Sequence, residues 1–436
     1  MSSDAPRVSD YASVTEYLYA LKAGGVKFGI DRMQQLAAVL GHPERSYPVI
    51  HIAGTNGKGS VAAMLESVFR TAGHRTGLYT SPHLVKLGER VQVDRRLLTE
   101  AEIVNYTAEL KPAADLISAH SPDERPTFFE FMTAMAFLQF QRKKVDVALV
   151  EVGMGGRLDA TNVVMPEISV ITSIGLDHCA ELGDTLAMIA GEKAGIIKPG
   201  RPVVMGRLPP EAEQVVREIA GRNRAPVHSV RESYGEALDG YPLSNLEGDY
   251  QRWNAATAEL VTRLVPEKLK PSAEIVTQGL LQVNWPGRWQ RTSIDGRPLI
   301  LDASHNPEGA AMLDLNLQRL VAASGRKPVI IAAALGELRA RALLEVAVRH
   351  AGEIHLITPR QARATPYEEM LALVPAAHRH LVHRATIESV FPDSSHCTVG
   401  GPDDTILVTG SIYLLGEVLE RIEPGRGAGE SRLQDF

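Results

Sequence analysis

The residues best suited to chemistry stand in one glycine-rich segment, Gly54 to Ser60, which contains a single lysine, Lys58. The apolar run from Tyr47 to Ala53 predicts a buried strand before it, and helical spacing predicts a helix from Val61 to Ala72 after it. In such a unit, glycines let backbone N–H groups approach phosphate oxygens, while the helix N-terminus and the lysine supply positive charge. The general pattern places Ser or Thr directly after Gly-Lys, whereas here Gly59 intervenes. An ordinary turn before a helix is the alternative, but the context and the lysine favour phosphate binding.

A second segment, Glu151 to Asn162, begins where another apolar run ends. Open α/β sheets bind ligands at the carboxyl ends of their strands, so Glu151 is well placed to hold a metal ion beside the phosphates. The glycines also suggest a dinucleotide-binding turn, but the sixth position of that pattern is Leu158 rather than Gly. A tight turn with an incidental acid is the other interpretation.

Three further residues are weaker candidates. His178 ends the next predicted strand and is either a metal ligand, a general base or a structural histidine. Ser81 would supply a hydroxyl group, although Ser-Pro also marks ordinary turns. Lys193 follows Glu192, and a neighbouring pair of this kind is normally solvated and contributes little to stability.

These candidates require elements that bring strand ends to one edge of a sheet. Up to about residue 290 the chain alternates apolar runs with helical patterns. The predicted strands are Val145–Val152, Glu167–Ile174 and Pro202–Met205, and the predicted helices are Phe128–Gln141 and Thr185–Ile197. This alternation predicts a mainly parallel sheet wrapped by helices.

The segment Asn284 to Arg288 predicts a linker, because its Pro and Gly break both periodicities. The alternation then restarts, and a second, smaller α/β domain is expected. Its predicted strands are Pro298–Leu301, Pro328–Ala333, Glu353–Ile357 and Thr405–Val408. Asp302 and His305 follow the first of these and either touch a ligand or cap the helix after Pro307. The Gly-rich segment from Pro424 to Ser431 predicts a disordered tail.

Composition excludes several classes of protein. The 436 residues suggest two or more domains, and 44% apolar residues are ample for packed cores. A net charge of -6 argues against a nucleic-acid-binding surface. Cys179 and Cys397 are too few for a disulfide framework, Met1 to Asp10 is too polar for a signal peptide, and the apolar helix Phe128 to Phe140 carries polar residues. We therefore expect a cytoplasmic protein without nucleic-acid or membrane partners.

Together these segments resemble the folylpolyglutamate synthase and dihydrofolate synthase family, within the wider class of Mur-type ATP-dependent amide ligases. The resemblance runs from about Lys27 to Glu417, and the motifs occur in the family's order. They are Gly54–Ser60, Ser81–Leu84, Glu151–Asn162, Leu176–His178, Glu192–Lys198, Asp302–Pro307 and Gly410–Gly416. The phosphate loop with its extra glycine is the family's own form.

The resemblance implies an α/β fold, in which a P-loop ATPase domain with a mainly parallel sheet is joined to a smaller Rossmann-like α/β domain. The implied ATP-binding, Mur-ligase-like central domain spans residues 1–284 and is followed by a linker at 285–290. A C-terminal glutamate-binding α/β domain then spans 291–423, before a tail at 424–436. A monomer is expected.

The resemblance also implies roles for single residues. Catalytic roles fall on Lys58, on His178 and on Lys193, which would be carbamylated on its side chain. The implied ATP contacts are Gly54, Thr55, Asn56, Gly57, Lys58, Gly59, Ser60, Asn254, Arg288 and Asp302, and the implied magnesium ligands are Ser81, Glu151 and His178. The implied pterin or folate contacts are Gly29, Ile30, Asp31, Thr127, Phe128, Phe129, Glu130, Leu158, Asp159 and Ala160. His305 and Ser411 would receive the incoming glutamate.

The implied activity is the ATP-dependent addition of L-glutamate to dihydropteroate, to reduced folates or to both, through an acyl phosphate. Phe128 and Phe129 would enclose a flat pterin ring in a bifunctional enzyme, or they are simply core residues at a helix start. One departure from the family is visible. Its usual Asp-Lys-Asp-like run is replaced by Glu337 to Arg341, which leaves the role of this loop open.

Three other activities stay open. The chain is a folylpolyglutamate synthase alone, or another Mur-type ligase that joins an amino acid to a different carboxylate, although Thr127 to Glu130 argues against peptidoglycan substrates. A P-loop nucleotide switch is the alternative from another class. Such a switch would not need a second α/β domain that carries Asp302 and His305.

Overall fold

The computed structural model describes residues 10–425 except 24, 26, 28 and 120. The tail predicted to be disordered begins at Pro424. Only Pro424 and Gly425 of this tail belong to the described residues, and residues 426–436 lie outside them. In the described part of the chain, no helix is both long and apolar enough to span a membrane.

The first half of the chain builds an eight-stranded sheet in the order β4-β3-β2-β5-β1-β6-β7-β8. Its strands are β1 (Val49–Ala53), β2 (Thr76–Tyr79), β3 (Val91–Val93), β4 (Arg96–Leu97), β5 (Val147–Glu151), β6 (Ile168–Ile171), β7 (Val203–Met205) and β8 (Val227–Ser229). The six strands from β2 to β8 in this order run parallel, and β3 and β4 add an antiparallel edge. The central strands β1, β5 and β6 are buried along their whole length and mostly apolar, as expected for a parallel sheet covered on both faces.

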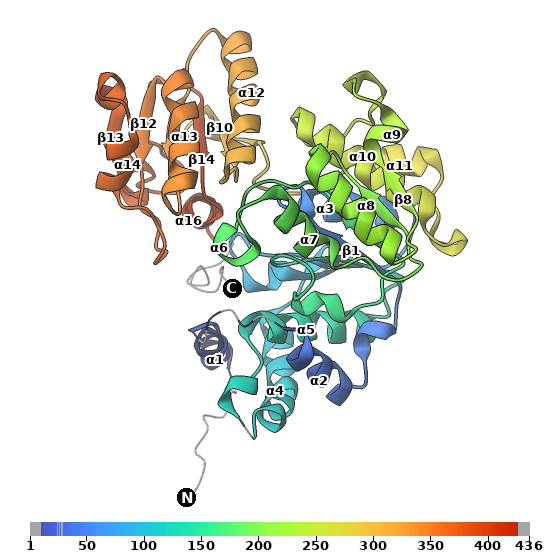
Figure 1. Cartoon of the computed structure of the whole chain (residues 1–436). Coiled ribbons are helices and arrows are strands. Elements are labelled where there is room, and N and C mark those ends of the chain that lie inside the picture. Colours follow the sequence, from blue (N-terminus) through green and yellow to red (C-terminus); the bar gives the residue numbers. More distant parts are fainter. Residues whose placement is uncertain (1–9, 24, 26, 28, 120, 426–436) are drawn as a thin grey trace, which may run out of the picture.

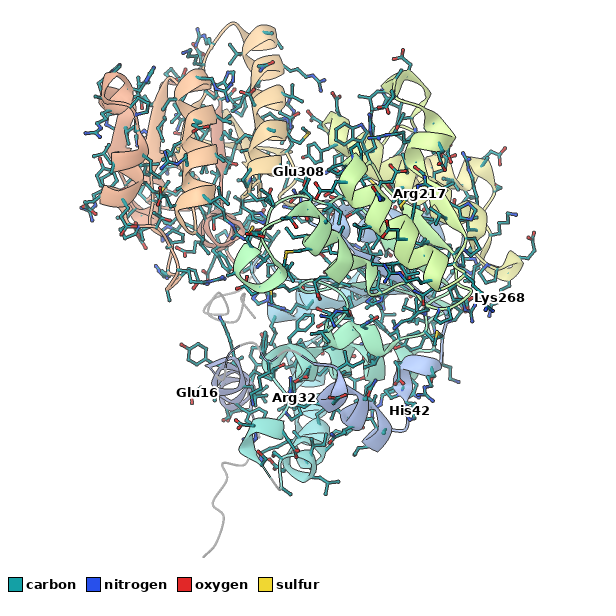
Figure 2. The ribbon with its side chains drawn as sticks, viewed as in Figure 1. Glu16, Arg32, His42, Arg217, Lys268 and Glu308 are labelled. Carbon is teal, nitrogen blue, oxygen red and sulfur yellow. The ribbon has the colours of Figure 1, made fainter. Side chains whose placement is uncertain are left out.

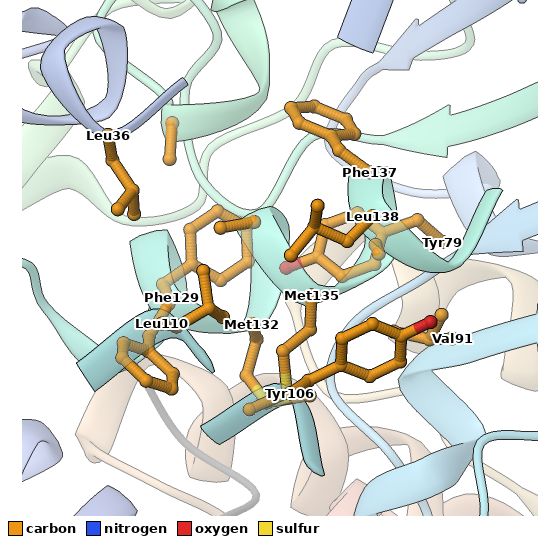
Figure 3. Packing of buried hydrophobic residues seen from close by; sticks show 14 of the residues in the cluster. Leu36, Tyr79, Val91, Tyr106, Leu110, Phe129, Met132, Met135, Phe137 and Leu138 are labelled. Carbon is orange, nitrogen blue, oxygen red and sulfur yellow. The ribbon is translucent and has the colours of Figure 1, made fainter. Parts of the chain in front are cut away.

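Helices cover both faces of this sheet (Figure 1). Those on one face are α1 (Tyr11–Ala23), α2 (Asp31–Val39), α4 (Glu100–Ile117) and α5 (Phe128–Lys143), with α7 (Leu186–Ala194) and α8 (Pro210–Arg222) farther along. Those on the other are α3 (Lys58–Thr71), α10 (Asp249–Leu264) and α11 (Ala273–Leu280), and two short helices are α6 (Cys179–Leu182) and α9 (Val230–Tyr234). Figure 3 shows the aromatic and methionine side chains that pack around α5. This helix is buried from Phe128 to Phe140, which confirms the predicted core helix.

The second half builds a six-stranded sheet in the order β13-β12-β11-β14-β10-β9, parallel except for β9. Its strands are β9 (Gln290–Ile294), β10 (Arg297–Asp302), β11 (Val329–Ala332), β12 (Glu353–Leu356), β13 (Val382–Arg384) and β14 (Ile406–Thr409). On one face lie α12 (Pro307–Ser324), α13 (Glu337–His350) and α14 (Tyr367–Leu373), and on the other α15 (Ile387–Val390) and α16 (Ile412–Ile422). This unit is drawn in orange and red in Figure 1.

The predicted fold class is confirmed, and several element ends differ from the predictions. The helix expected from Val61 begins at Lys58, because Gly57 adopts a φ of 83° and turns the chain directly into α3. The helix expected to reach Ile197 ends at Ala194, although the apolar residues beyond it stay buried in a loop. Gln290, placed in the linker, is already the first residue of β9.

Candidate active site

A cleft of about 430 Å³ lies between the two sheets. Its walls carry residues that follow β1, β5 and β6 of the first sheet and β10, β11 and β14 of the second. All six are parallel strands, so both sheets contribute their carboxyl ends, where α/β proteins bind ligands. Glu308, at the start of α12, lies at this boundary in Figure 2. The cleft collects every predicted ATP contact except Asp302, together with the predicted metal and glutamate residues.

The glycines of the predicted phosphate loop are required by close neighbours. A Cβ atom on Gly57 would lie 2.5 Å from the Asn254 side-chain oxygen, and one on Gly59 would lie 2.6 Å from the Trp285 ring. The loop is also fixed from β6, since the backbone N–H of Thr55 donates to the Ser173 carbonyl at 2.8 Å. These neighbours therefore fix the backbone conformation of the loop.

Two lysines converge on this loop. Lys58 Nζ donates to the carbonyl oxygens of Gly54 and Thr55 at 3.0 and 3.1 Å. Lys193 Nζ donates to the same Gly54 oxygen at 3.0 Å, and its side chain is buried. Burial, and then the positive charge of Lys58, lower the pKa of Lys193 to about 7.

The alternative that Lys193 forms an ordinary solvated pair with Glu192 does not apply. Glu192 pairs instead with Arg157 at 2.7 Å. Because successive residues of a helix point in different directions, Lys193 lines the cleft whereas Glu192 does not.

The three predicted metal ligands line the same cleft. Glu151 is buried at the end of β5, and burial raises its pKa to about 7 against the opposing charge of Lys58. Its Oε2 accepts the Ser81 backbone N–H at 3.3 Å, and the Ser81 hydroxyl is buried without a hydrogen-bond partner among the described residues. Burial lowers the pKa of His178 to about 4, which leaves a neutral imidazole.

An unpaired hydroxyl, a buried carboxylate and a neutral imidazole fit a divalent cation, although Mg²⁺ usually prefers oxygen ligands. No three His, Cys, Asp or Glu side chains cluster as metal ligands in the described ranges. The predicted set contains a serine and does not depend on such a cluster.

The second sheet faces the loop with the remaining predicted residues. Asp302 ends β10 and is buried, with one carboxylate oxygen on the Ser304 N–H at 2.8 Å. His305 Nδ1 lies 2.8 Å from the Ala303 carbonyl, and Ser411 caps α16 through the Tyr413 N–H at 3.2 Å. The alternative that Asp302 and His305 cap α12 is wrong, because Asn306 caps that helix by accepting the Gly309 N–H at 2.9 Å.

A separate pocket gathers most of the predicted pterin contacts. Its wall contains Gly29, Thr127, Phe128, Phe129, Glu130, Leu158, Asp159 and Ala160. Ile30 and Asp31 are not on this wall: Ile30 precedes α2 and Asp31 is exposed. The sequence reasoning missed Lys22, Lys27 and Met154, which also line the pocket.

The acid of this pocket already has partners. Glu130 accepts the Thr127 backbone N–H at 2.7 Å and pairs with Arg32 of α2 at 3.2 Å. A Thr–Glu pair three residues apart is a capping box, a signal present in the sequence that we did not use there.

Asp177, which the sequence placed only within the motif Leu176–His178, forms hydrogen bonds that connect the two sheets. Its carboxylate accepts from Arg339 of α13 at 2.6 Å and from the Asn306 side chain at 3.1 Å. Asn306 in turn exchanges hydrogen bonds with Asn56 of the phosphate loop at 3.0 and 3.1 Å. These contacts pair residues far apart in the chain, so no local sequence signal points to them.

Comparisons with known proteins agree with this geometry. Residues 52–230 match the Mur ligase middle domain. A Bacillus subtilis dihydrofolate synthase/folylpolyglutamate synthase is 33% identical over 95% of this chain and 99% of its own length. An Escherichia coli protein of the same name is 32% identical over 97% and 98%.

Solved structures are similar over almost the whole chain. The E. coli FolC protein in complex with DHPP and ADP has a TM-score of 0.82 and 29% identity, covering 97% of this chain and 100% of that one. A Thermotoga maritima folylpolyglutamate synthase has a TM-score of 0.81 and 28% identity, covering 97% and 99%. With a Mur ligase middle domain around the phosphate loop and near full-length likeness on both sides of the cleft, this chain belongs to the folylpolyglutamate synthase/dihydrofolate synthase family.

Proposed function

We propose that this chain is an ATP-dependent ligase that joins L-glutamate to dihydropteroate and to reduced folates. The cleft carries the proposal, because it sets a phosphate loop with Lys58 and Lys193 opposite His305 and Ser411. The names of the relatives support it, and one solved E. coli relative holds DHPP and ADP. Mycobacterium tuberculosis relatives were solved with ADP and AMPPCP, which supports ATP as the nucleotide.

The proposed first step activates the pterin carboxylate, which is a poor electrophile. An oxygen of the carboxylate attacks the γ-phosphorus of ATP, the bond to the β-phosphate oxygen breaks, and an acyl phosphate and ADP result. Charge in this step lies on phosphoryl oxygens, so positioning and electrostatics dominate. Lys58 and the N–H groups of the Gly54–Ser60 loop would contact these oxygens. Bound Mg²⁺, held by Ser81, Glu151 and His178, would neutralise further phosphate charge.

The second step joins the amino acid. The neutral amine of glutamate attacks the acyl carbon, the bond to the phosphate oxygen breaks, and inorganic phosphate leaves as the amine loses its proton. His305 and Ser411 are proposed to place the amino acid on the second sheet's side of the cleft. Asn254, Arg288 and Asp302 are proposed to contact ATP.

We also propose that Lys193 is carbamylated. Its neutral amine would attack carbon dioxide, forming an N–C bond and releasing a proton, and a pKa of about 7 makes that neutral form abundant. Lys193 and Lys58 donate to the same Gly54 oxygen, so two ammonium groups would repel each other there. A carbamate would replace that repulsion with attraction.

The whole chain is proposed to act as one cytoplasmic monomer. The eight-stranded sheet and its helices end at α11 and the second sheet starts at β9, which supports an ATP-binding domain at 1–284, a linker at 285–290 and a glutamate-binding domain at 291–423.

Folylpolyglutamate synthase activity alone is the second candidate, and a specific observation favours it. Phe128 and Phe129 are almost fully buried, with Arg90 stacked 5.1 Å from the Phe128 ring centre. Glu130 is already bonded to Thr127 and Arg32. These residues therefore have structural roles as well as forming the pocket wall.

One assay separates the two candidates. With dihydropteroate as the only pterin, we expect ADP release that depends on added glutamate, because dihydropteroate and folates present a carboxylate to the same phosphoryl acceptor position. Tetrahydrofolate in place of dihydropteroate serves as the control for an active preparation. Activity with tetrahydrofolate but none with dihydropteroate would leave a folylpolyglutamate synthase alone, and activity with neither would contradict the ligase assignment.

The metal assignment predicts a shift in magnesium dependence. Glu151→Gln and His178→Ala should each raise the Mg²⁺ concentration for half-maximal ADP formation by about tenfold or more, as a lost ligand commonly does. Because the pKa of Glu151 is about 7, its proton competes with the metal, so the wild-type requirement should also rise from pH 8 to pH 6. Titrations of both variants that overlay the wild type would exclude these ligands.

A further inference from the structure

Arg339 is a charged residue of the cleft to which no predicted role is assigned. It lies in the first turn of α13, directly after β11, within the run Glu337 to Arg341 that departs from the family's usual sequence. Its side chain is about four-fifths buried and lines the cleft between the two sheets. Arg341, two residues later, pairs with Glu337 at the surface instead.

The position of Arg339 is fixed by one carboxylate. Its Nη2 donates to Asp177 Oδ1 at 2.6 Å, and His305 Nε2 lies 3.9 Å from the other oxygen of the same group. Arg339 therefore lies beside His305, on the side of the cleft where glutamate is proposed to bind.

Neither His305 nor Ser411, the two residues proposed to receive glutamate, supplies a full positive charge. Glutamate brings two carboxylates, whereas Ser411 is neutral and burial lowers the pKa of His305 to about 4. A guanidinium carries five N–H donors in a planar fork. Among the described residues Arg339 uses one of its nitrogens, on Asp177, so further donors are free for a second carboxylate.

We propose that Arg339 binds a carboxylate of the incoming glutamate and thereby selects an acidic amino acid, while Asp177 holds the guanidinium in place. This inference rests on the proposed ligase function. It assigns to this chain a specificity residue within a loop whose sequence departs from the family. Arg363 also lines the cleft, and the experiment below distinguishes the two arginines.

The test compares Arg339→Gln with the wild type on three amino acids: glutamate, glutamine, which lacks the side-chain carboxylate, and the α-amide of glutamate, which lacks the other. We expect KM for glutamate to rise by roughly 10- to 100-fold, as for a lost charge-assisted hydrogen bond, with KM for ATP unchanged. The discrimination between glutamate and one of the two amides should shrink by the same factor. Where an amide is not turned over, its inhibition constant replaces KM.

Two further variants control the result. Arg339→Lys keeps the charge and should recover part of the discrimination, and Arg341→Gln on the same helix should leave all constants unchanged. Thermal unfolding confirms that each variant is folded. Equal loss on glutamate and both amides would overturn the proposal, because a residue that only positions Asp177 cannot distinguish them; discrimination that stays intact in Arg339→Gln would do the same and point to Arg363. A wild type without glutamate-dependent ADP release would refute the proposed function itself.

Discussion

Lys58→Ala is expected to lower the rate of glutamate-dependent ADP formation by about 100- to 1000-fold, the usual cost of one lost charge contact to a transition state. The ammonium of Lys58 is already held over the loop by the Gly54 and Thr55 carbonyl oxygens. It therefore contributes its charge without reorganisation when the γ-phosphoryl group moves. The side chain is half-buried at the start of α3 and packs no apolar core, so the melting temperature should change little.

Lys111→Ala provides the matched control. Lys111 lies on α4 and pairs with Asp115 at 2.7 Å. It is not one of the residues that line the cleft. A partly exposed pair of this kind contributes little to stability, and Asp115 keeps its second partner Arg125 at 2.8 Å, so the substitution should affect neither rate nor melting temperature. A folded Lys58→Ala protein with the rate of the Lys111→Ala protein would end the phosphate-loop assignment.

The sequence was informative wherever a local pattern carries the chemistry. Gly54 to Ser60, Glu151 and His178 each end a buried apolar run, and parallel strands bring such ends to one edge, so their convergence was predictable. Asp302 and Ser411 follow from the same rule in the second sheet. The edge strands β4, β8, β9 and β13 were missed, because short strands with polar residues lack the apolar run that marks a buried one.

Contacts between the sheets could not be predicted in this way. Asp177 and Arg339 are paired across the cleft, although 162 positions separate them in the sequence. Asn56 and Asn306 are paired in the same way across a separation of 250 positions. Nothing in either local segment specifies its partner, because both are ordinary strand-end polar residues until the two sheets face each other. Lys193 illustrates the same limit, since Glu192 is its neighbour in sequence but its partner in space is the Gly54 carbonyl of the phosphate loop.

Lys193→Ala is expected to lower the rate by on the order of 100-fold or more, since it removes a charged group beside the phosphate loop. The size of the loss does not say which charge the wild-type side chain carries. A small molecule that fills the space left by the substitution can identify this charge. Acetate should partly restore the rate if the wild-type group is a carbamate, whereas methylamine should restore it if the group is a plain ammonium.

The pH dependence of carbamylation gives an independent readout. Only the neutral amine reacts with carbon dioxide, and a pKa of about 7 means that this form is a minor species at pH 6 and the major one at pH 8. Protein depleted of carbon dioxide should therefore regain activity on adding bicarbonate faster at pH 8 than at pH 6, and isotope-labelled bicarbonate should give a carbamate NMR signal that Lys193→Ala lacks. Lys58→Ala should keep that signal while staying inactive, and acetate should not rescue it. Rescue of Lys193→Ala by methylamine alone, with no labelled carbamate in the wild type, would show that Lys193 acts as a cation.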